Sequence, residues 1–170
     1  PCMSFREVDL KSLEFSPFEK IGDEWALVTA GTTSGYNTMT VSWGGMGVLW
    51  GKDVVTIYVR PQRYTKEFLD ANDRFTLSFY APEHKEALRY LGTHSGRDSY
   101  KATHVGFTPA YLDGSVTFEQ ASLVLVCRKL YADDIRPEKF LDPEIDGRSY
   151  PEHDYHTMYV AEVEHALVAE

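Results

Sequence analysis

The stretch Asn37-Thr38-Met39-Thr40-Val41-Ser42-Trp43 is the part of the sequence that says most about the fold. Polar and large apolar side chains alternate along it, and a β-strand places successive side chains on opposite faces of its sheet. The pattern predicts a strand with three hydroxyl groups on one face, closed by Gly44 and Gly45. Such hydroxyl groups can donate to carbonyl or phosphate oxygens without adding charge, although a solvated sheet face would show the same pattern.

Alternating or β-branched runs elsewhere predict further strands. Two short helices are expected, at Thr65–Asn72 with Thr65 as N-cap and at Pro82–Leu91, and the acidic stretch 132–155 is expected to be a loop. Strands and helices do not alternate regularly, which argues against a parallel doubly wound sheet. The sequence predicts an all-β fold, an antiparallel barrel with minor helices. The six expected strands are Glu24–Ala30, Asn37–Trp43, Val54–Arg60, Phe75–Tyr80, Val116–Tyr131 and His156–Val168.

Length and composition narrow the class of protein. The 170 residues fit a single domain over 1–170, and 43% hydrophobic residues are typical of a globular chain. A formal net charge of −9 argues against nucleic acid as the main partner, because a phosphate backbone requires clustered cations. No apolar stretch approaches membrane-spanning length, so no membrane association is expected. The two cysteines suit a reducing compartment, and a cytoplasmic location is expected.

Two basic segments could bind an anion. Val59–Thr65 runs from a strand end into a helix start, where free N–H groups favour phosphate and Arg60 and Arg63 stand nearby. Gly92–Asp98, followed by Lys101, combines small, polar and basic groups in a loop that could approach an oxyanion closely. A solvated turn explains the first segment equally well, and a helix C-cap with a polar loop explains the second.

The histidines do not indicate a metal site. His153 and His156 are three residues apart at a loop-to-strand junction, and on a strand this spacing points two side chains to opposite faces. No nearby cysteine or third histidine completes a ligand set, so no metal is expected. No nucleophile-elbow sequence is present either, which leaves no basis for a Ser-His-Asp triad.

In their order along the chain, these segments resemble the flavin reductase family of FMN-binding split β-barrels, and most of all its flavoredoxin-like branch. The resemblance extends from about residue 22 to the C-terminal end. Each motif alone is moderately specific, whereas their order and spacing are more so. The matching stretches are Tyr36–Gly44, Tyr58–Thr65, Phe75–Phe79, Ser95–Asp98 with Lys101, and Asp154–Tyr159.

The resemblance implies a six-stranded antiparallel Greek-key barrel that works as a homodimer. It implies FMN along the hydroxyl strand, with the flavin ring near the dimer interface. The two basic segments would surround the phosphate. Which of them binds it directly is left open. The implied FMN-binding residues are Asn37, Thr38, Met39, Thr40, Val41, Ser42, Arg60, Arg63, Tyr64, Thr65, Ser95, Gly96, Arg97 and Lys101.

The reaction implied by the resemblance is carried by the flavin itself. Reduced nicotinamide, as NADH or NADPH, would stack on the flavin ring and deliver a hydride to N5, so no catalytic side chain is expected. The chain is thus predicted to be an NAD(P)H:flavin oxidoreductase. Two alternatives stay open: a flavoredoxin-like electron carrier served by a redox partner protein, and a module that binds FMN without turnover.

Overall fold

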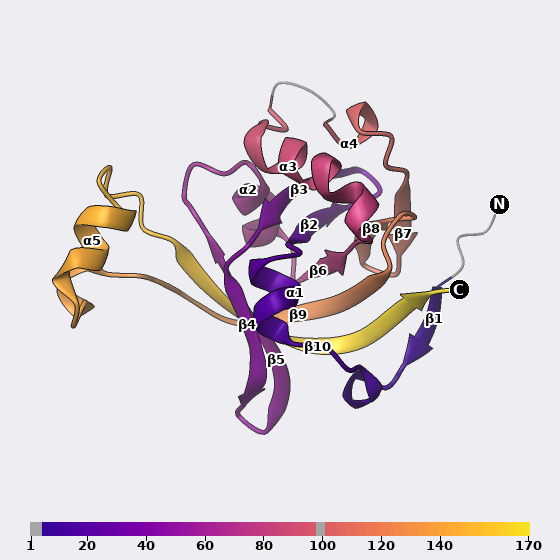
Figure 1. Cartoon of the computed structure of the whole chain (residues 1–170), viewed down its shortest axis with the longest axis horizontal. Coiled ribbons are helices and arrows are strands. Elements are labelled where there is room, and N and C mark those ends of the chain that lie inside the picture. Colours follow the sequence, from indigo (N-terminus) through magenta and orange to yellow (C-terminus); the bar gives the residue numbers. More distant parts are fainter. Residues whose placement is uncertain (1–4, 98–100) are drawn as a thin grey trace.

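The computed structural model describes residues 5–97 and 101–170, and antiparallel strands make up most of it (Figure 1). Within these residues, eight strands form one sheet and two form a separate hairpin. The large sheet contains β1 (Phe5–Val8), β2 (Ala26–Thr32), β3 (Gly35–Val41), β4 (Gly44–Leu49), β5 (Lys52–Val59), β6 (Arg74–Phe79), β9 (Leu123–Asp134) and β10 (Thr157–Ala169). The hairpin consists of β7 (Pro109–Leu112) and β8 (Ser115–Phe118).

The two edges of the main sheet path meet at one corner. The strand order is β3-β2-β6-β9-β10-β5-β4, with β1 pairing β10 off this path. β3 and β4 therefore lie at opposite ends of the order, yet only Ser42 and Trp43 separate them in the chain. A sheet whose first and last strands are joined by two residues must curl until its edges approach each other. The result is a barrel that is split along the β3–β4 seam.

Hydrophobic side chains fill the barrel and also cover part of its outside. Met39 and Val41 point into the barrel beside Ile57, Phe75 and Tyr159. They belong to the apolar face of residues 37–43. A second cluster packs the outer face of β2 and β9, with Tyr80 just after β6, against the helical segments and the hairpin. Strands that are buried on both faces are expected to read as continuous apolar runs, as β9 does at its start.

Five helices and three 3-10 turns connect the strands in the described residues. The α-helices are α1 (Pro17–Gly22), α2 (Thr65–Ala71), α3 (Lys85–Thr93), α4 (Lys101–His104) and α5 (Pro143–Ser149). The 3-10 turns are η1 (Leu10–Ser12), η2 (Pro82–His84) and η3 (Pro137–Lys139). In Figure 1, β9 and β10 extend from the barrel and carry α5 away from its body. None of the described helices has the length and apolar character needed to cross a membrane.

The expected antiparallel β-sheet with a few helices is confirmed, but the described residues contain ten strands rather than six. Val116–Tyr131 is two strands, β8 and β9, because a turn after Phe118 reverses the chain. Gly44 and Gly45 are the first residues of a further strand, β4. This strand was not predicted because glycines have no side chains to show an alternating pattern. A Cβ atom at Gly44 would lie 2.9 Å from the Thr56 carbonyl oxygen, so the close pairing with β5 requires glycine.

One helix prediction and one loop prediction also need correction. Thr65 is the first residue of α2 rather than its N-cap, and Tyr64 occupies the cap position without a capping hydrogen bond. The acidic stretch 132–155 is not a plain loop, because β9 continues to Asp134 and α5 follows. Asp142 accepts a hydrogen bond from the Glu144 N–H and precedes a proline at the first helical position, which is a helix-start signal.

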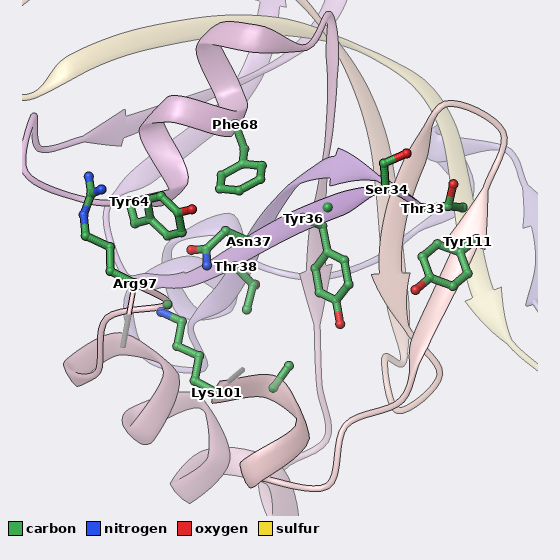
Figure 2. Close-up of a pocket in the computed structure, with 13 residues that line it drawn as sticks. Thr33, Ser34, Tyr36, Asn37, Thr38, Tyr64, Phe68, Arg97, Lys101 and Tyr111 are labelled. Atoms are coloured by element: carbon green, nitrogen blue, oxygen red, sulfur yellow. The ribbon is translucent and has the colours of Figure 1, made fainter. Parts of the chain in front are cut away.

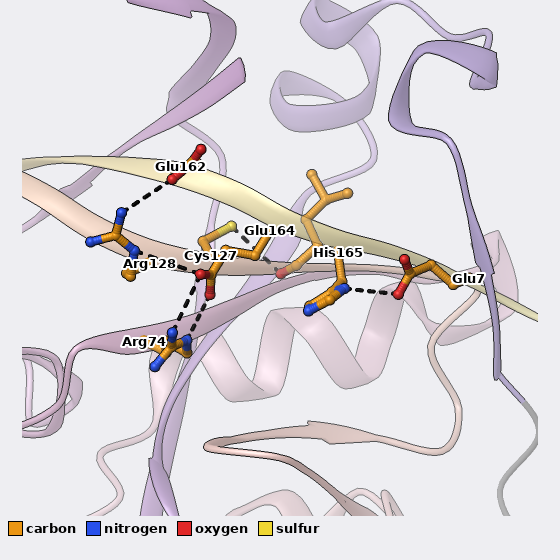
Figure 3. A network of polar contacts seen from close by, with 8 residues as sticks. Glu7, Arg74, Cys127, Arg128, Glu162, Glu164 and His165 are labelled. Carbon is orange, nitrogen blue, oxygen red and sulfur yellow. Dashed lines mark hydrogen bonds and ion pairs between the residues drawn. The ribbon is translucent and has the colours of Figure 1, made fainter. Parts of the chain in front are cut away.

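A network of charged side chains joins β6, β9 and β10 on the outer face of the sheet (Figure 3). Arg74 lies 2.6 Å from Glu164, and Arg128 bridges Glu162 and Glu164 at 3.2 and 3.6 Å. Cys127 belongs to the same region but is buried, and burial raises the pKa of its thiol far above the usual range. The network connects three neighbouring strands, and Cys127 is an inert core residue.

Candidate functional site

Three hollows follow one another along β3 and its continuation into β4. Within residues 5–97 and 101–170, β3 pairs with β2 alone and its other edge is unpaired. An edge strand directs free N–H and C=O groups outward. The tyrosine cavity, of about 760 Å³, is lined by residues 33–38, Tyr64, Phe68, Gly96, Arg97, Lys101, Ala102 and Tyr111. The arginine cleft, of about 290 Å³, is lined by residues 39–43, Tyr58, Arg60, Arg63 and His156. The tryptophan cavity, of about 630 Å³, is lined by Pro17, Phe18, Ile21, Gly22, residues 42–46, Tyr58, Ile135, Tyr150 and His156.

The hydroxyl face of β3 is packed rather than open. The Thr38 hydroxyl donates to the Val28 carbonyl at 3.2 Å and lies 2.8 Å from the Thr29 hydroxyl. The Thr40 hydroxyl donates to the Leu88 carbonyl of α3, which covers this face. Ser42 alone of the three is exposed. The strand therefore offers a ligand its unpaired edge, and two of the three hydroxyl groups expected to face a ligand instead hold β2 and α3 in place.

Asn37 and Thr65 form a buried polar pair at the inner end of the tyrosine cavity. The Thr65 hydroxyl donates to Asn37 Oδ1 at 2.7 Å, and both residues are buried. A Cβ atom at Gly96 would lie 1.8 Å from Asn37 Nδ2, so the loop backbone passes directly over the Asn37 amide. This close approach brings the loop after α3 together with β3 and α2, which are distant from it in sequence.

Arg63 and Lys101 place two positive charges side by side at the C-terminal end of α3. Arg63 Nη1 donates to the Gly92 carbonyl at 3.1 Å, and Lys101 Nζ donates to the carbonyls of Leu91 and His94 at 2.9 and 2.8 Å. Burial, followed by the nearby Arg63, lowers the pKa of Lys101 to about 8. Among the described residues neither cation has an acidic partner. Two neighbouring cations attract an anion, and in the described part of the chain no carboxylate fills that role.

Arg60 and Arg97, in contrast, have acidic partners. Arg60 lies 3.0 Å from Asp154 and 5.0 Å from the centre of the Tyr150 ring, so it holds the segment after α5. Arg97 pairs with Glu67, and its guanidinium lies 4.4 Å from the Tyr64 ring centre. The two basic segments predicted from the sequence therefore each supply one arginine with an acidic partner and one cation that has none in residues 5–97 and 101–170.

The tryptophan cavity has an aromatic lining that includes His156. Trp43 is 53% exposed, and its ring centre lies 5.4 Å from that of the buried His156. His156 Nδ1 lies 2.7 Å from the Tyr150 hydroxyl. Burial, and then the charge of Arg60, lowers the pKa of His156 to about 4, so the ring is neutral at neutral pH. His153 is exposed beside Tyr155, and no group of three metal-binding side chains occurs in the described part of the chain.

The structure brings the predicted site residues together in two neighbouring hollows, with two exceptions. Thr65 lies behind Asn37 in the core, and Ser95 is exposed in the loop, where its hydroxyl accepts from the Arg97 N–H at 3.2 Å. Sequence reasoning did not include Tyr58, Tyr150 or His156 among the site residues, although the segments Tyr58–Thr65 and Asp154–Tyr159 were part of the resemblance. The tyrosine cavity receives Asn37, Thr38, Tyr64, Gly96, Arg97 and Lys101. The arginine cleft receives Met39, Thr40, Val41, Ser42, Arg60 and Arg63.

The family assignment follows from comparison with known proteins. The family described as flavin reductase like domain matches residues 18–170, which is most of the chain. The chain belongs to the flavin reductase like domain family. This confirms the family expected from the motifs along β3 and after β5. No curated protein matches the chain by sequence.

Solved structures share the fold of this flavin reductase like domain at low sequence identity. An FMN-binding domain of a flavin reductases-like enzyme from Shewanella baltica is 16% identical, with a TM-score of 0.69 over 98% of this chain and 78% of that one. The flavoredoxin of Desulfovibrio vulgaris is 17% identical, with a TM-score of 0.67 over 86% and 69%. The styrene monooxygenase flavin reductase from Pseudomonas putida is 18% identical, with a TM-score of 0.62 over 86% and 79%.

Proposed function

We propose that this flavin reductase like domain binds FMN along the unpaired edge of β3 and reduces it with NADH or NADPH. The proposal rests on the order of cationic and aromatic side chains along that edge. Arg63 and Lys101 have no acidic partner among the described residues. Trp43, Tyr58 and Tyr150 line the hollows that follow them along β3 and β4. FMN has the same order, with an anionic phosphate at one end and a flat ring at the other.

The residues present fit FMN by their donor chemistry and by the continuity of the hollows. The arginine cleft and the tryptophan cavity adjoin each other, since Ser42, Trp43, Tyr58 and His156 line both. Arg63 and Lys101 would hold the phosphate as charged hydrogen-bond donors, and the free edge of β3 would meet the ring with backbone groups. Tyr58, Trp43 and the neutral His156 would exclude water from one side of the ring.

Bound FMN would supply the redox chemistry, as an acceptor of a hydride at N5 of its ring. The chain's own contribution is binding, orientation and protection from water. Neutral His156 can act as a hydrogen-bond donor or acceptor but, with its pKa lowered to about 4, it does not store a proton at neutral pH. We therefore assign no acid or base role to a side chain.

A homodimer is part of the proposal because the groove is open on one side. Trp43 is 53% exposed, and Phe18, which also lines the tryptophan cavity, is 88% exposed. A second copy placed over these side chains would cover the ring. A cytoplasmic location is proposed from the buried free thiol of Cys127.

A flavoredoxin-like carrier is the second candidate, since the fold is shared with a flavoredoxin as well as with reductases. An absorbance spectrum of the purified protein, followed by anaerobic titration with NADH and then NADPH, separates the possibilities. Bleaching of the flavin by either nicotinamide supports the reductase. Flavin that stays oxidised with both, but accepts electrons from a reduced protein donor, supports the carrier. Absence of any FMN binding would refute both.

A further inference from the structure

Arg60 connects the end of β5 to a segment that lies 89 residues further along the chain, between α5 and β10. Its Nη2 donates to the Ser149 carbonyl at 3.0 Å, and its Nη1 lies 3.0 Å from Asp154 Oδ1. The guanidinium carbon also lies 5.0 Å from the centre of the Tyr150 ring. One side chain therefore holds both ends of residues 149–154, a segment that we name the strap.

Arg97 has the same kinds of partner in a more solvated place. It pairs with Glu67, and its guanidinium lies near the Tyr64 ring, as Figure 2 shows beside Lys101. The Arg97 side chain is 53% exposed, whereas that of Arg60 is 26% exposed. Water and salt screen an exposed ion pair strongly and a half-buried one less. The contacts of Arg60 are therefore the better suited to hold a chain segment in place.

The strap places the Tyr150 ring in the wall of the tryptophan cavity. Tyr150 is 4% exposed and lines this cavity, and its hydroxyl lies 2.7 Å from His156 Nδ1. In Figure 1, α5 stands away from the barrel, so this helix contributes little to holding the ring against the barrel. At the far end of the strap, Gln62 Nε2 donates to Asp154 Oδ2 at 2.8 Å. The position of Tyr150 thus depends on the contacts of Arg60 and on the bond to His156.

We infer that Arg60 is a positioning residue, which fastens the strap so that Tyr150 forms a fixed wall of the tryptophan cavity. The inference rests on the proposed function, because it takes this cavity to receive the flavin ring. Hydride transfer between two rings requires close and well-oriented stacking, and a misplacement of about 1 Å can slow such a step about a hundred-fold. A loosened wall should therefore slow flavin reduction more than it weakens flavin binding.

The first measurement is the rate of flavin reduction after rapid mixing of the FMN-loaded protein with saturating NADH or NADPH. Arg60→Ala should lower this rate about ten-fold, while the dissociation constants of FMN and riboflavin change by a similar, small factor. Arg60→Lys keeps a charge for Asp154 but lacks the planar fork that also reaches Ser149, so it should recover part of the rate. Arg136→Ala is the control, because Arg136 pairs with Asp133 at 3.2 Å, and it should retain the parent rate.

A double-mutant cycle tests whether Arg60 acts through Tyr150. Tyr150→Ala should lower the reduction rate at least as much as Arg60→Ala does. Adding Arg60→Ala to Tyr150→Ala should then have no further effect, since the ring that Arg60 positions is absent. A second full loss in the double variant would show that Arg60 acts on the flavin directly, which would overturn the inference.

Amide hydrogen exchange tests the fastening on the protein without flavin. The Tyr150 N–H donates to the Asp146 carbonyl at 2.8 Å and the His153 N–H to the Tyr150 carbonyl at 3.1 Å, so both amides are protected while the strap is in place. Arg60→Ala should speed exchange in peptides that cover residues 149–156 about ten-fold, and Arg136→Ala should not.

Two results of the exchange measurement would overturn the inference. One is unchanged exchange in Arg60→Ala, and the other is faster exchange together with an unchanged rate of flavin reduction. If the parent protein binds no flavin, the proposed function fails. Exchange then still decides whether Arg60 fastens the strap, since faster exchange in Arg60→Ala supports this contact and unchanged exchange refutes it.

Discussion

Arg63 and Lys101 donate hydrogen bonds to the carbonyls of adjacent residues, Gly92 and Leu91, at the C-terminal end of α3. The end of a helix carries a partial negative charge of about half an elementary charge, which favours one cation but does not neutralise two. Their mutual repulsion lowers the pKa of Lys101 beyond the effect of burial. In the proposed function this pair holds the phosphate of the flavin, which makes the two arginines of the segment after β5 unequal.

Arg63→Ala is expected to weaken FMN binding far more than riboflavin binding. The loss for FMN should be about 1.5–3 kcal/mol, because one charged hydrogen bond disappears. Arg60 is the matched control: it already pairs with Asp154 at 3.0 Å, so Arg60→Ala should change both affinities by a similar, small factor. Flavin fluorescence titration gives all four dissociation constants. Equal losses for FMN and riboflavin in Arg63→Ala would show that this side chain does not meet the phosphate.

The affinity for FMN should fall as the pH rises through about 8. Lys101 titrates there because its pKa is lowered by burial and by Arg63, and only its protonated form attracts a phosphate. One linked proton limits the fall to about ten-fold per pH unit. Riboflavin has no phosphate, so its affinity should stay level over the same range. Dissociation constants measured between pH 6.5 and 9.5 test this, and parallel curves for the two ligands would contradict it.

The sequence predicted the fold better than it predicted the site, for a physical reason. Met39 and Val41 showed their burial by alternation, which is a local property of one strand. The position of β3 and β4 at the two sheet edges depends on the pairing of all the strands, which is not a local property. In addition, the glycine-rich start of β4 has no alternating pattern that would predict a strand. The unpaired edge of β3 could therefore not be foreseen, nor could the burial of the Thr40 hydroxyl under α3.

Gly96→Ala is expected to weaken FMN binding about ten-fold or more with little loss of stability, which corresponds to about 1.4 kcal/mol of binding energy. The added methyl group would lie 1.8 Å from Asn37 Nδ2, and the loop will yield before the buried Asn37 does. The loop then moves away from β3 together with the groups around the cation pair. Gly147→Ala, on α5 with no atom within 4 Å, is the control and should bind FMN normally. Unchanged affinity in Gly96→Ala would mean that the loop does not contribute to the site.

His156 should make the folded protein sensitive to mild acid. Its pKa is lowered from 6.5 to about 4 by burial, so between these values the unfolded chain takes up a proton that the folded chain does not. Stability therefore decreases as the pH falls through this window, with a slope that approaches about 1.4 kcal/mol per pH unit.

The comparison of His156→Gln with the parent protein isolates this contribution, because carboxylates that titrate in the same range are common to both. The free energy of unfolding, measured with urea at pH 7.5, 6.5 and 5.5, should fall less steeply with decreasing pH for His156→Gln than for the parent protein. His153→Asn provides the control: His153 is exposed and has a φ of 59°, a conformation that asparagine adopts readily, so its decline should match the parent. If His156→Gln declines as steeply as the parent, His156 takes up its proton in the folded state, and a neutral ring beside Trp43 is not part of the site.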